Sequence, residues 1–320
     1  MKKDEKIKPK IEFKKLEKSR PIKNGQEVRV TKMNHIVDVL SLAVEPTALY
    51  KIKKIDKEHY LDLETGKVYE YELNENRGQN IIGLKETFKT IRNLINNNFT
   101  GSSNELFVTL TYAENMTDLK KLYEDFKYFI KKLKRKYNDL DYLSIVEPQA
   151  RGAWHCHVLL RFNGLDEIYL ENNEEVWPMW GHGFTKTKKL KNVDNVGAYL
   201  NAYLTDVEVC DENSEIIFNS AKTSSGELKC EMFEKDVDEG GRTVKKKYIK
   251  GARLHLYPTG MQIYRCSRGI KKPETELMKY REAKKIVGLR QANYSRTIEL
   301  TADSRPVNTI TYEQYNLKRL

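Results

Sequence analysis

The chain has 320 residues, a net charge of +11 and 39% hydrophobic residues. This basic excess favours a polyanionic partner, either nucleic acid or an anionic membrane surface. No stretch is long and apolar enough for a transmembrane helix, and the first residues lack the apolar core of a secretion signal, so we expect a soluble cytoplasmic protein with no membrane partner. The four cysteines are scattered without a CxxC pair, which argues against a disulfide scaffold and a cysteine-based zinc site.

The N-terminal part is predicted to lie outside any catalytic core. Residues 1–25 are rich in lysine and poor in apolar side chains, which indicates a flexible basic tail. Residues 26–83 form an N-terminal accessory region. Within it, 27–33 alternate like a strand, and 59–71 read as a hairpin that turns at 65–66. None of these residues forms a recognisable catalytic motif.

The next segments predict a helix, a strand and a second helix. Apolar residues recur with helical spacing over 84–99 and again over 117–137. Between them, 106–112 is a run of β-branched and aromatic residues typical of a strand. Both helices carry basic side chains away from their apolar stripes. These form either a solvated surface or contacts to a DNA backbone.

Two histidines lie on one short strand. Residues 142–147 predict a strand, 148–152 a turn, and 154–160 the strand that returns from it. Successive strand side chains alternate between faces, so His155 and His157 point to the same side and Cys156 points into the core. Two imidazoles side by side on a rigid strand are half of a metal site.

A carboxylate can complete this site. Glu147 ends the preceding strand and can face back toward His155, and Gln149 is the competing third ligand. Two imidazoles and one carboxylate, with open positions for water and substrate, suit a divalent ion such as Mg²⁺ or Mn²⁺. Such an ion polarises a phosphodiester and offsets the charge that develops on its oxygens.

A tyrosine pair follows downstream. Residues 177–184 predict a glycine-punctuated loop in which His182 stands alone, with little indication that it is a ligand. The helix predicted over 195–204 places Tyr199 and Tyr203 at i and i+4, on one face. A tyrosine oxygen can attack phosphorus and form a covalent phosphotyrosine.

The C-terminal third predicts three further regions. Residues 206–246 are polar and read as an insertion, 247–274 hold strands and a basic segment, and 275–320 predict a helix and a tail. The strand–helix–strand–strand order within 84–205 predicts an α+β fold on an antiparallel sheet. There is no G-x-x-x-x-G-K-[ST] motif, so no helicase motor of that type is expected in the chain.

Three motifs in order resemble those of a known enzyme superfamily. They are the strand ending at Tyr112, the His155-Cys156-His157 triplet, and the segment from Tyr199 to Tyr203. Together they resemble the HUH endonucleases, and more narrowly the rolling-circle replication initiator (Rep) proteins of bacterial plasmids and single-stranded DNA phages. The resemblance covers roughly residues 84–270.

The resemblance implies a fold and a reaction. The implied fold is an antiparallel five-stranded sheet of RRM-like or ferredoxin-like topology with flanking helices and the histidines on a central strand. The implied reaction is site-specific nicking of one DNA strand, with a 5′-phosphotyrosine and a free 3′-hydroxyl that primes synthesis. Tyr199 and Tyr203 resemble the two-tyrosine subclass, although the lysine that many relatives carry three residues after a catalytic tyrosine is replaced here by Ala202 and Asp206.

The expected partners follow from this interpretation. They are single-stranded DNA at a hairpin nick site in a replication origin, and a host helicase and DNA polymerase. The expected DNA-contacting residues are Lys85, Lys89, Arg92, Lys131, Lys134, Arg135, Arg151, Lys186, Lys188, Lys189, Arg265 and Arg268. Two alternatives stay open. One is an HUH transposase or mobilisation relaxase with the same chemistry. The other is a non-catalytic protein that binds single-stranded nucleic acid through an RRM-like sheet.

Overall fold

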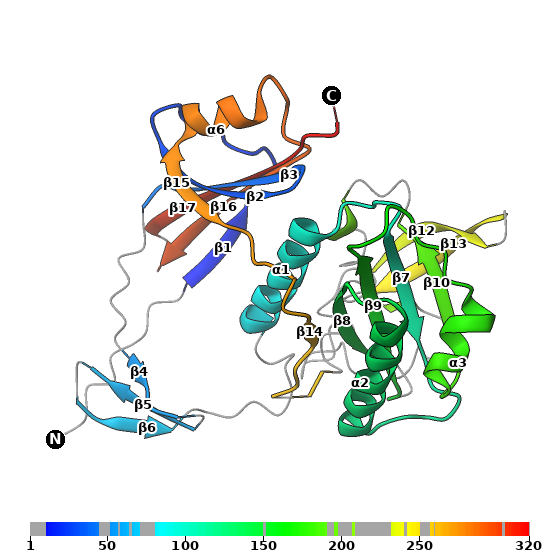
Figure 1. Ribbon diagram of the computed structural model, residues 1–320. Helices are drawn as coiled ribbons and strands as arrows, with labels where there is room; N and C mark the ends of the chain where they lie inside the picture. The colour runs from blue at the N-terminus through cyan, green and yellow to red at the C-terminus, as the bar shows by residue number, and fades with distance from the viewer. Residues whose placement is uncertain are drawn as a thin grey trace. The chain divides into compact units, whose positions relative to one another are not determined.

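A computed structural model describes residues 11–44, 52–56, 58–63, 66–70, 81–149, 152–190, 195–197, 207–208, 232–239, 242–249, 257–258, 260–302 and 305–319. The chain divides into two compact units (Figure 1). Unit 1 combines residues 1–73 with 273–320, and unit 2 comprises residues 74–272. The predicted α+β class with mostly antiparallel sheets is confirmed. Within the described ranges, no helix has the length and apolar character needed to cross a membrane.

The main sheet of unit 2 has five strands, and every neighbouring pair is antiparallel. In spatial order the strands are β10 (Thr185–Lys189), β7 (Glu105–Leu110), β9 (Trp154–Phe162), β8 (Leu140–Pro148) and β14 (Tyr264–Cys266). Because β7 and β8 both run antiparallel to β9, they run parallel to each other, with β9 between them. The helix α2 (Leu119–Lys136) connects β7 to β8, so β9 occupies the centre of the sheet.

One face of this sheet is covered by α2. Asp118 caps the start of the helix, and its carboxylate accepts the main-chain N–H groups of Lys120 and Lys121 at 2.8 and 3.2 Å. The apolar stripe of α2 is buried, and the ring of Phe126 packs edge-on against Tyr142. Tyr142 is paired with Leu160 across β8 and β9. The helix therefore packs against the face that carries Leu160 and the other even-numbered side chains of β9.

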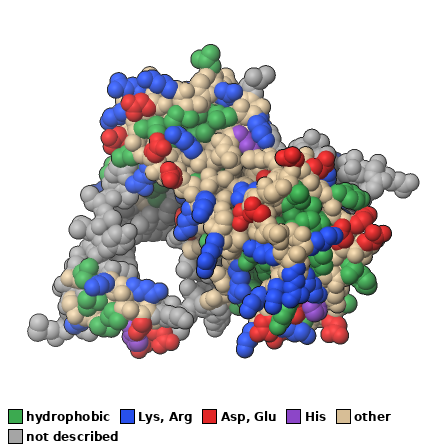
Figure 2. Space-filling view, in the orientation of Figure 1, with side chains coloured by type: hydrophobic (Ala, Val, Ile, Leu, Met, Phe, Trp, Pro, Cys, Tyr) green, Lys and Arg blue, Asp and Glu red, His purple; other side chains and the backbone are tan. Residues whose placement is uncertain are grey.

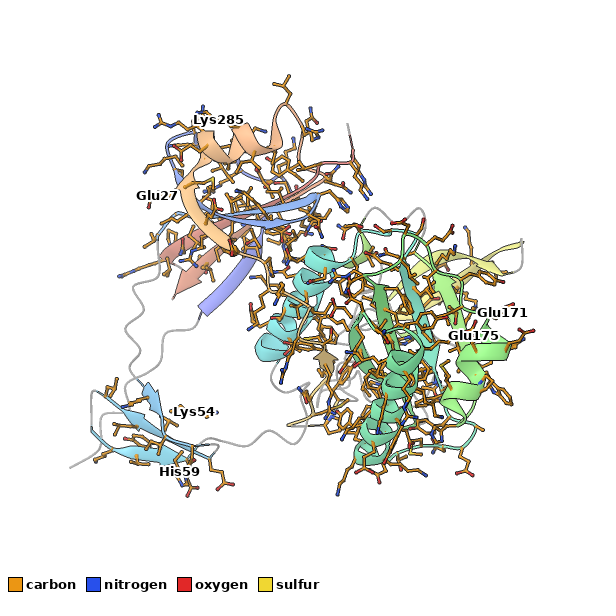
Figure 3. The ribbon with its side chains drawn as sticks, viewed as in Figure 1. Glu27, Lys54, His59, Glu171, Glu175 and Lys285 are labelled. Atoms are coloured by element: carbon orange, nitrogen blue, oxygen red, sulfur yellow. The ribbon has the colours of Figure 1, made fainter. Side chains whose placement is uncertain are left out.

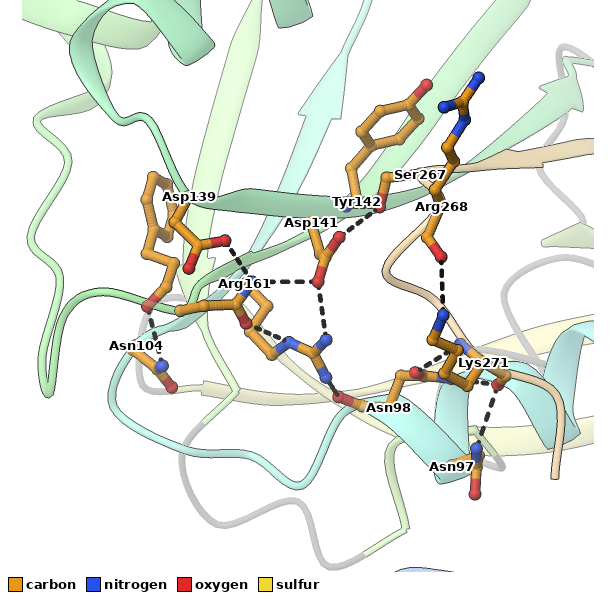
Figure 4. Close-up of polar contacts among 12 residues, drawn as sticks. Asn97, Asn98, Asn104, Asp139, Asp141, Tyr142, Arg161, Ser267, Arg268 and Lys271 are labelled. Carbon is orange, nitrogen blue, oxygen red and sulfur yellow. Dashed lines mark hydrogen bonds and ion pairs between the residues drawn. The ribbon is translucent and has the colours of Figure 1, made fainter.

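The opposite face meets the C-terminal end of α1 (Ile81–Asn98). Arg161 lies on this odd-numbered face of β9 and donates to the main-chain carbonyl of Asn98 at 2.7 Å. It also donates to Asp141 at 2.8 Å. The Asp141 carboxylate accepts further hydrogen bonds from Asn163 at 3.0 Å and Ser267 at 2.7 Å (Figure 4). This buried network ties α1, β8, β9 and the loop after β14 together at one end of the sheet.

Unit 2 also contains smaller elements. The π-helical segment η2 (Asn172–Val176) leads directly into the short helix α3 (Trp177–Trp180). A second sheet consists of β11 (Val207–Glu208), β13 (Arg242–Ile249) and β12 (Met232–Glu239), in that order.

Unit 1 is built on a six-stranded antiparallel sheet. In spatial order its strands are β1 (Ile11–Lys15), β16 (Tyr294–Ala302), β17 (Arg305–Asn316), β3 (Ile36–Leu42), β2 (Glu27–Met33) and β15 (Thr275–Lys279). The helix α6 (Tyr280–Val287) shares one apolar core with valines of β2 and β3. A separate three-stranded sheet contains β4 (Ile52–Lys54), β5 (His59–Asp62) and β6 (Val68–Glu70), where the predicted hairpin joins β5 to β6.

Several predicted irregular segments are in fact ordered. The predicted tail at 275–320 holds β15, β16 and β17 as well as α6, and the predicted tail at 1–25 holds β1. Within the predicted insertion at 206–246, β12 and the first part of β13 form a hairpin. The predicted loop at 177–184 begins with α3. In unit 1 these predictions were wrong because pairing with strands distant in sequence, rather than local apolar patterning, orders the segments.

Candidate metal centre

The register of the central strands places four polar side chains on one face. His157 on β9 is directly opposite Thr109 on β7, and His155 is directly opposite Glu147 on β8. Directly opposed residues of antiparallel strands share a face of the sheet. His155, His157, Glu147 and Thr109 therefore lie on the face that α2 does not cover, while Cys156 is only 1% exposed on the other side.

A short contact joins His157 to Glu147. The Nε2 atom of His157 lies 2.5 Å from Oε2 of Glu147, and these side chains are 11% and 7% exposed. Burial strengthens such a contact because little water competes for either group. Glu147 is thus next to both histidines, since it is paired with His155 in the strand register and bonded diagonally to His157.

The ring of His157 is held on two further sides. Its Nδ1 atom lies 3.3 Å from the Thr109 hydroxyl, and Phe107 stacks on it with a centroid distance of 5.4 Å and an interplanar angle of 10°. When a protein histidine binds a metal through one ring nitrogen, the other nitrogen commonly makes a hydrogen bond that orients the ring. Thr109 occupies that orienting position for a metal held through Nε2.

The donor set suits a divalent ion, although the three side chains do not yet enclose one. The His155 and His157 rings are 6.4 Å apart and inclined at 74°, and no described group of three His, Cys, Asp or Glu side chains forms a closed metal cluster. Two neighbouring ligands of an octahedral ion at about 2.1 Å are about 3 Å apart. A separation of Glu147 and His157 by roughly half an ångström therefore makes room for an ion between them.

The alternative ligand Gln149 has a different setting. It lies in the turn after β8, where its main-chain N–H donates to the carbonyl of Ala153 at 2.7 Å and its carbonyl accepts from Gly152. The geometry thus favours Glu147, whose carboxylate is already in contact with a histidine.

The edge strand β10 brings lysines to the same face. Lys186 is paired with Thr109 and Lys188 with Phe107, and both lysines are exposed. Lys189 points to the other face and forms an ion pair with Glu167 at 2.5 Å. The three predicted DNA-contacting lysines of this segment are therefore separated, with two beside the histidines and one away from them.

The remaining predicted DNA-contacting residues are dispersed. On α1, Lys89 is exposed and Arg92 is partly buried. Exposed residues on α2, which covers the face opposite the histidines, are Lys131, Lys134 and Arg135. Arg268 is also exposed. Arg265 packs its guanidinium 3.6 Å from the ring centroid of Tyr123, so it takes part in packing against α2.

Four predicted site residues are not described in full. Tyr199, Tyr203 and Arg151 lie outside the described residues, and for Lys85 only the backbone is described. The nearest described residues before Tyr199 are Val196 and Gly197, which are helical and buried.

The structure adds two residues that the sequence patterns did not single out. Phe107 stacks on His157, and its position two residues before Thr109 on a strand is the signal that could have identified it. Asn96 of α1 accepts the main-chain N–H of Gly197 at 2.8 Å. No local pattern marks Asn96, because its partner is 101 residues away in the sequence.

Comparison with known families gives one match. Residues 105–208 match a family of replication-associated proteins, that of the replication-associated protein ORF2. The matched stretch covers about a third of the chain and contains both histidines, Glu147 and the two tyrosines. No curated protein matches the chain.

Proposed function

We propose that the protein initiates rolling-circle DNA replication by nicking one DNA strand at a specific site and later rejoining it, through a 5′-phosphotyrosine. The observation that carries this proposal is the buried contact of Glu147 with His157, beside His155 on one open sheet face. The match of this stretch to a replication-associated family supports the same role.

The side chains divide the chemistry between them. A divalent ion, Mg²⁺ or Mn²⁺, held by His155, His157 and Glu147 would polarise the scissile phosphate and offset the charge on its oxygens. Thr109 fixes the orientation of the His157 ring through Nδ1. The exposed Lys186 and Lys188 are placed to attract the DNA backbone to this face.

The covalent step is an exchange of bonds at phosphorus. The phenolic oxygen of Tyr199 or Tyr203 forms a bond to phosphorus while the bond from phosphorus to the 3′-oxygen breaks. The tyrosine loses its proton, and the departing 3′-oxygen takes up a proton to become a hydroxyl. A 3′-hydroxyl that attacks the phosphotyrosine reverses the exchange, which joins DNA ends and frees the tyrosine.

The partners follow from the same proposal. A host DNA polymerase extends the freed 3′-hydroxyl, and a host helicase separates the strands, because the sequence has no P-loop motif with which to do so.

The direct test is detection of the covalent adduct. Labelled single strands that tile the DNA on both sides of the gene are incubated with the full chain and Mn²⁺, then separated by denaturing electrophoresis. We expect one strand to yield a cleaved product and a protein–DNA adduct. Both should disappear with EDTA, with His157→Ala and with Tyr199→Phe/Tyr203→Phe. Tyr128→Phe is the matched control, because Tyr128 is exposed on α2.

Each other outcome has a defined meaning. An adduct that persists in the double tyrosine variant shows that another residue is the nucleophile. Cleavage that resists EDTA contradicts the metal site. Binding of single strands without cleavage of any of them supports the non-catalytic alternative.

A further inference from the structure

Unit 1 carries most of the net charge of the protein. Its two sequence segments contain 26 Lys and Arg and 19 Asp and Glu, so they contribute +7 of the +11. Lys and Arg side chains gather over α6 (Figure 2), and Lys285 extends from this helix (Figure 3). We define the α6 basic cluster as Arg281, Lys284, Lys285 and Arg290.

Other basic residues of unit 1 are neutralised by carboxylates. Lys279, just before α6, pairs with Glu27 at 3.4 Å, and Lys32 pairs with Glu276 at 3.3 Å. By contrast, no carboxylate of the described residues forms an ion pair with any member of the α6 basic cluster. The one acidic residue of α6, Glu282, accepts the main-chain N–H of Lys279 at 3.3 Å.

Main-chain carbonyls help to hold the cluster together. Lys284 donates to the carbonyl of Arg290 at 3.3 Å, and Arg290 donates to the carbonyls of Arg319 at 3.1 Å and Val287 at 3.4 Å. These bonds satisfy donors but leave the positive charges uncompensated. Like charges held close together repel one another, and a bound polyanion removes that cost.

We infer that the α6 basic cluster is a second DNA-binding surface, and that it binds the phosphate backbone of duplex DNA. Binding of single strands relies on exposed aromatic rings on which bases stack. The two tyrosines packed beneath this helix, Tyr280 and Tyr315, are only 8% and 2% exposed. A charged surface of this kind suits the regular phosphate rows of a duplex. The inference does not rest on the nicking site in unit 2.

The test compares charge changes of equal size in the full chain. Arg281→Gln/Lys285→Gln alters two exposed side chains and keeps good helix formers. We expect affinity for a short labelled duplex at 0.1 M salt to fall on the order of tenfold for each lost phosphate contact, and the slope of log affinity against log salt to become shallower by about 2. Arg281→Lys/Lys285→Arg should retain the affinity.

Lys53→Gln/Lys54→Gln is the matched control, because it removes two exposed charges from β4. Unchanged duplex affinity in Arg281→Gln/Lys285→Gln overturns the inference, as does an equal loss in the β4 control. A loss of affinity for single strands alone contradicts the assignment to duplex DNA. Nicking of a short single strand should stay at the wild-type rate. A chain that nicks nothing but still shows the duplex effect refutes only the proposed function.

Discussion

Asn96 on α1 accepts the main-chain N–H of Gly197 at 2.8 Å, and this bond fixes the helical segment that immediately precedes Tyr199 in the sequence. The two backbones come very close there. A Cβ atom on residue 197 would lie 2.5 Å from the Asn96 side-chain oxygen and 2.8 Å from the carbonyl of Arg92. The glycine is therefore required by the contact with α1.

Gly197→Ala should slow nicking while leaving metal binding intact. The added methyl group pushes residues 195–197 away from α1, and misplacement of a reacting group by about 1 Å can cost on the order of a hundredfold in rate. Single-turnover nicking measures the loss. Gly164→Ala is the control, because no atom lies within 4 Å of the added Cβ there. Equal rates for both variants would show that this contact does not position the nucleophile.

Thr109→Val should weaken metal binding without unfolding the sheet. Valine keeps the shape and strand propensity of threonine but removes the hydroxyl that lies 3.3 Å from Nδ1 of His157. Loss of such an orienting partner typically reduces metal affinity by about 10- to 100-fold. Titration with Mn²⁺, followed by the rise in melting temperature, measures it. Thr187→Val, which loses a bond to Asn172 on the opposite face of the same sheet, should bind Mn²⁺ normally.

Cysteine labelling tests the assignment of the two faces of β9. Burial raises the pKa of the Cys156 thiol, and the reactive species is the thiolate. Partial burial also raises the pKa of Cys266, but that side chain reaches solvent. In a background with Cys210→Ser and Cys230→Ser, iodoacetamide should modify Cys266 in the native protein and Cys156 only after denaturation. Native labelling of both at one rate would contradict the placement of Cys156 in the core.

The Asp141–Arg161 network predicts a loss of stability in acid. Burial of Asp141 raises its pKa, but hydrogen bonds from Asn163, Ser267 and Arg161 and the positive charge of Arg161 outweigh burial, so the pKa lies below its ordinary value. A carboxyl group with a lowered pKa in the folded state stabilises the fold fully above its unfolded pKa of about 3.9. That stabilisation disappears as the pH falls from there through the folded pKa.

Asp141→Asn should therefore destabilise the protein at pH 7, by about 1–3 kcal/mol. The difference from wild type should shrink below about pH 4, where the wild-type carboxyl group becomes protonated. Thermal unfolding followed by circular dichroism at pH 7 and pH 3 measures both values. Asp166→Asn, at an exposed loop position, is the control. A constant difference across this range would rule out a contribution from the Asp141 charge.

Local patterns were enough to predict the centre of unit 2. Apolar spacing and the capping Asp118 predicted α2 to within two residues at each end, and alternation predicted that His155 and His157 share a face. These features depend only on residues close in sequence. The contact of Glu147 with His157 was within reach for the same reason, because a short turn joins their strands.

Other elements depend on partners that local patterns do not identify. The polar strand β10 forms because it pairs with β7, about 80 residues earlier, and its alternation of threonine with lysine carries no apolar signal. In unit 1, β1 is a five-residue edge strand among lysines, and it is ordered by pairing with β16. The docking of Gly197 on Asn96 likewise depends on a distant helix.

The pairing of β3 with β17 in unit 1 joins Leu42 to Ile310 and Ile36 to Asn316. The ribosome completes all of unit 2 between making these two strands, so the sheet of unit 1 cannot close until synthesis of the chain is nearly finished. Closing so long a loop costs less entropy once the intervening residues are already compact. Folding on the ribosome should therefore proceed from the middle of the chain outward. A nascent chain arrested before residue 294 should contain a protease-resistant unit 2 and a protease-sensitive β2–β3 segment.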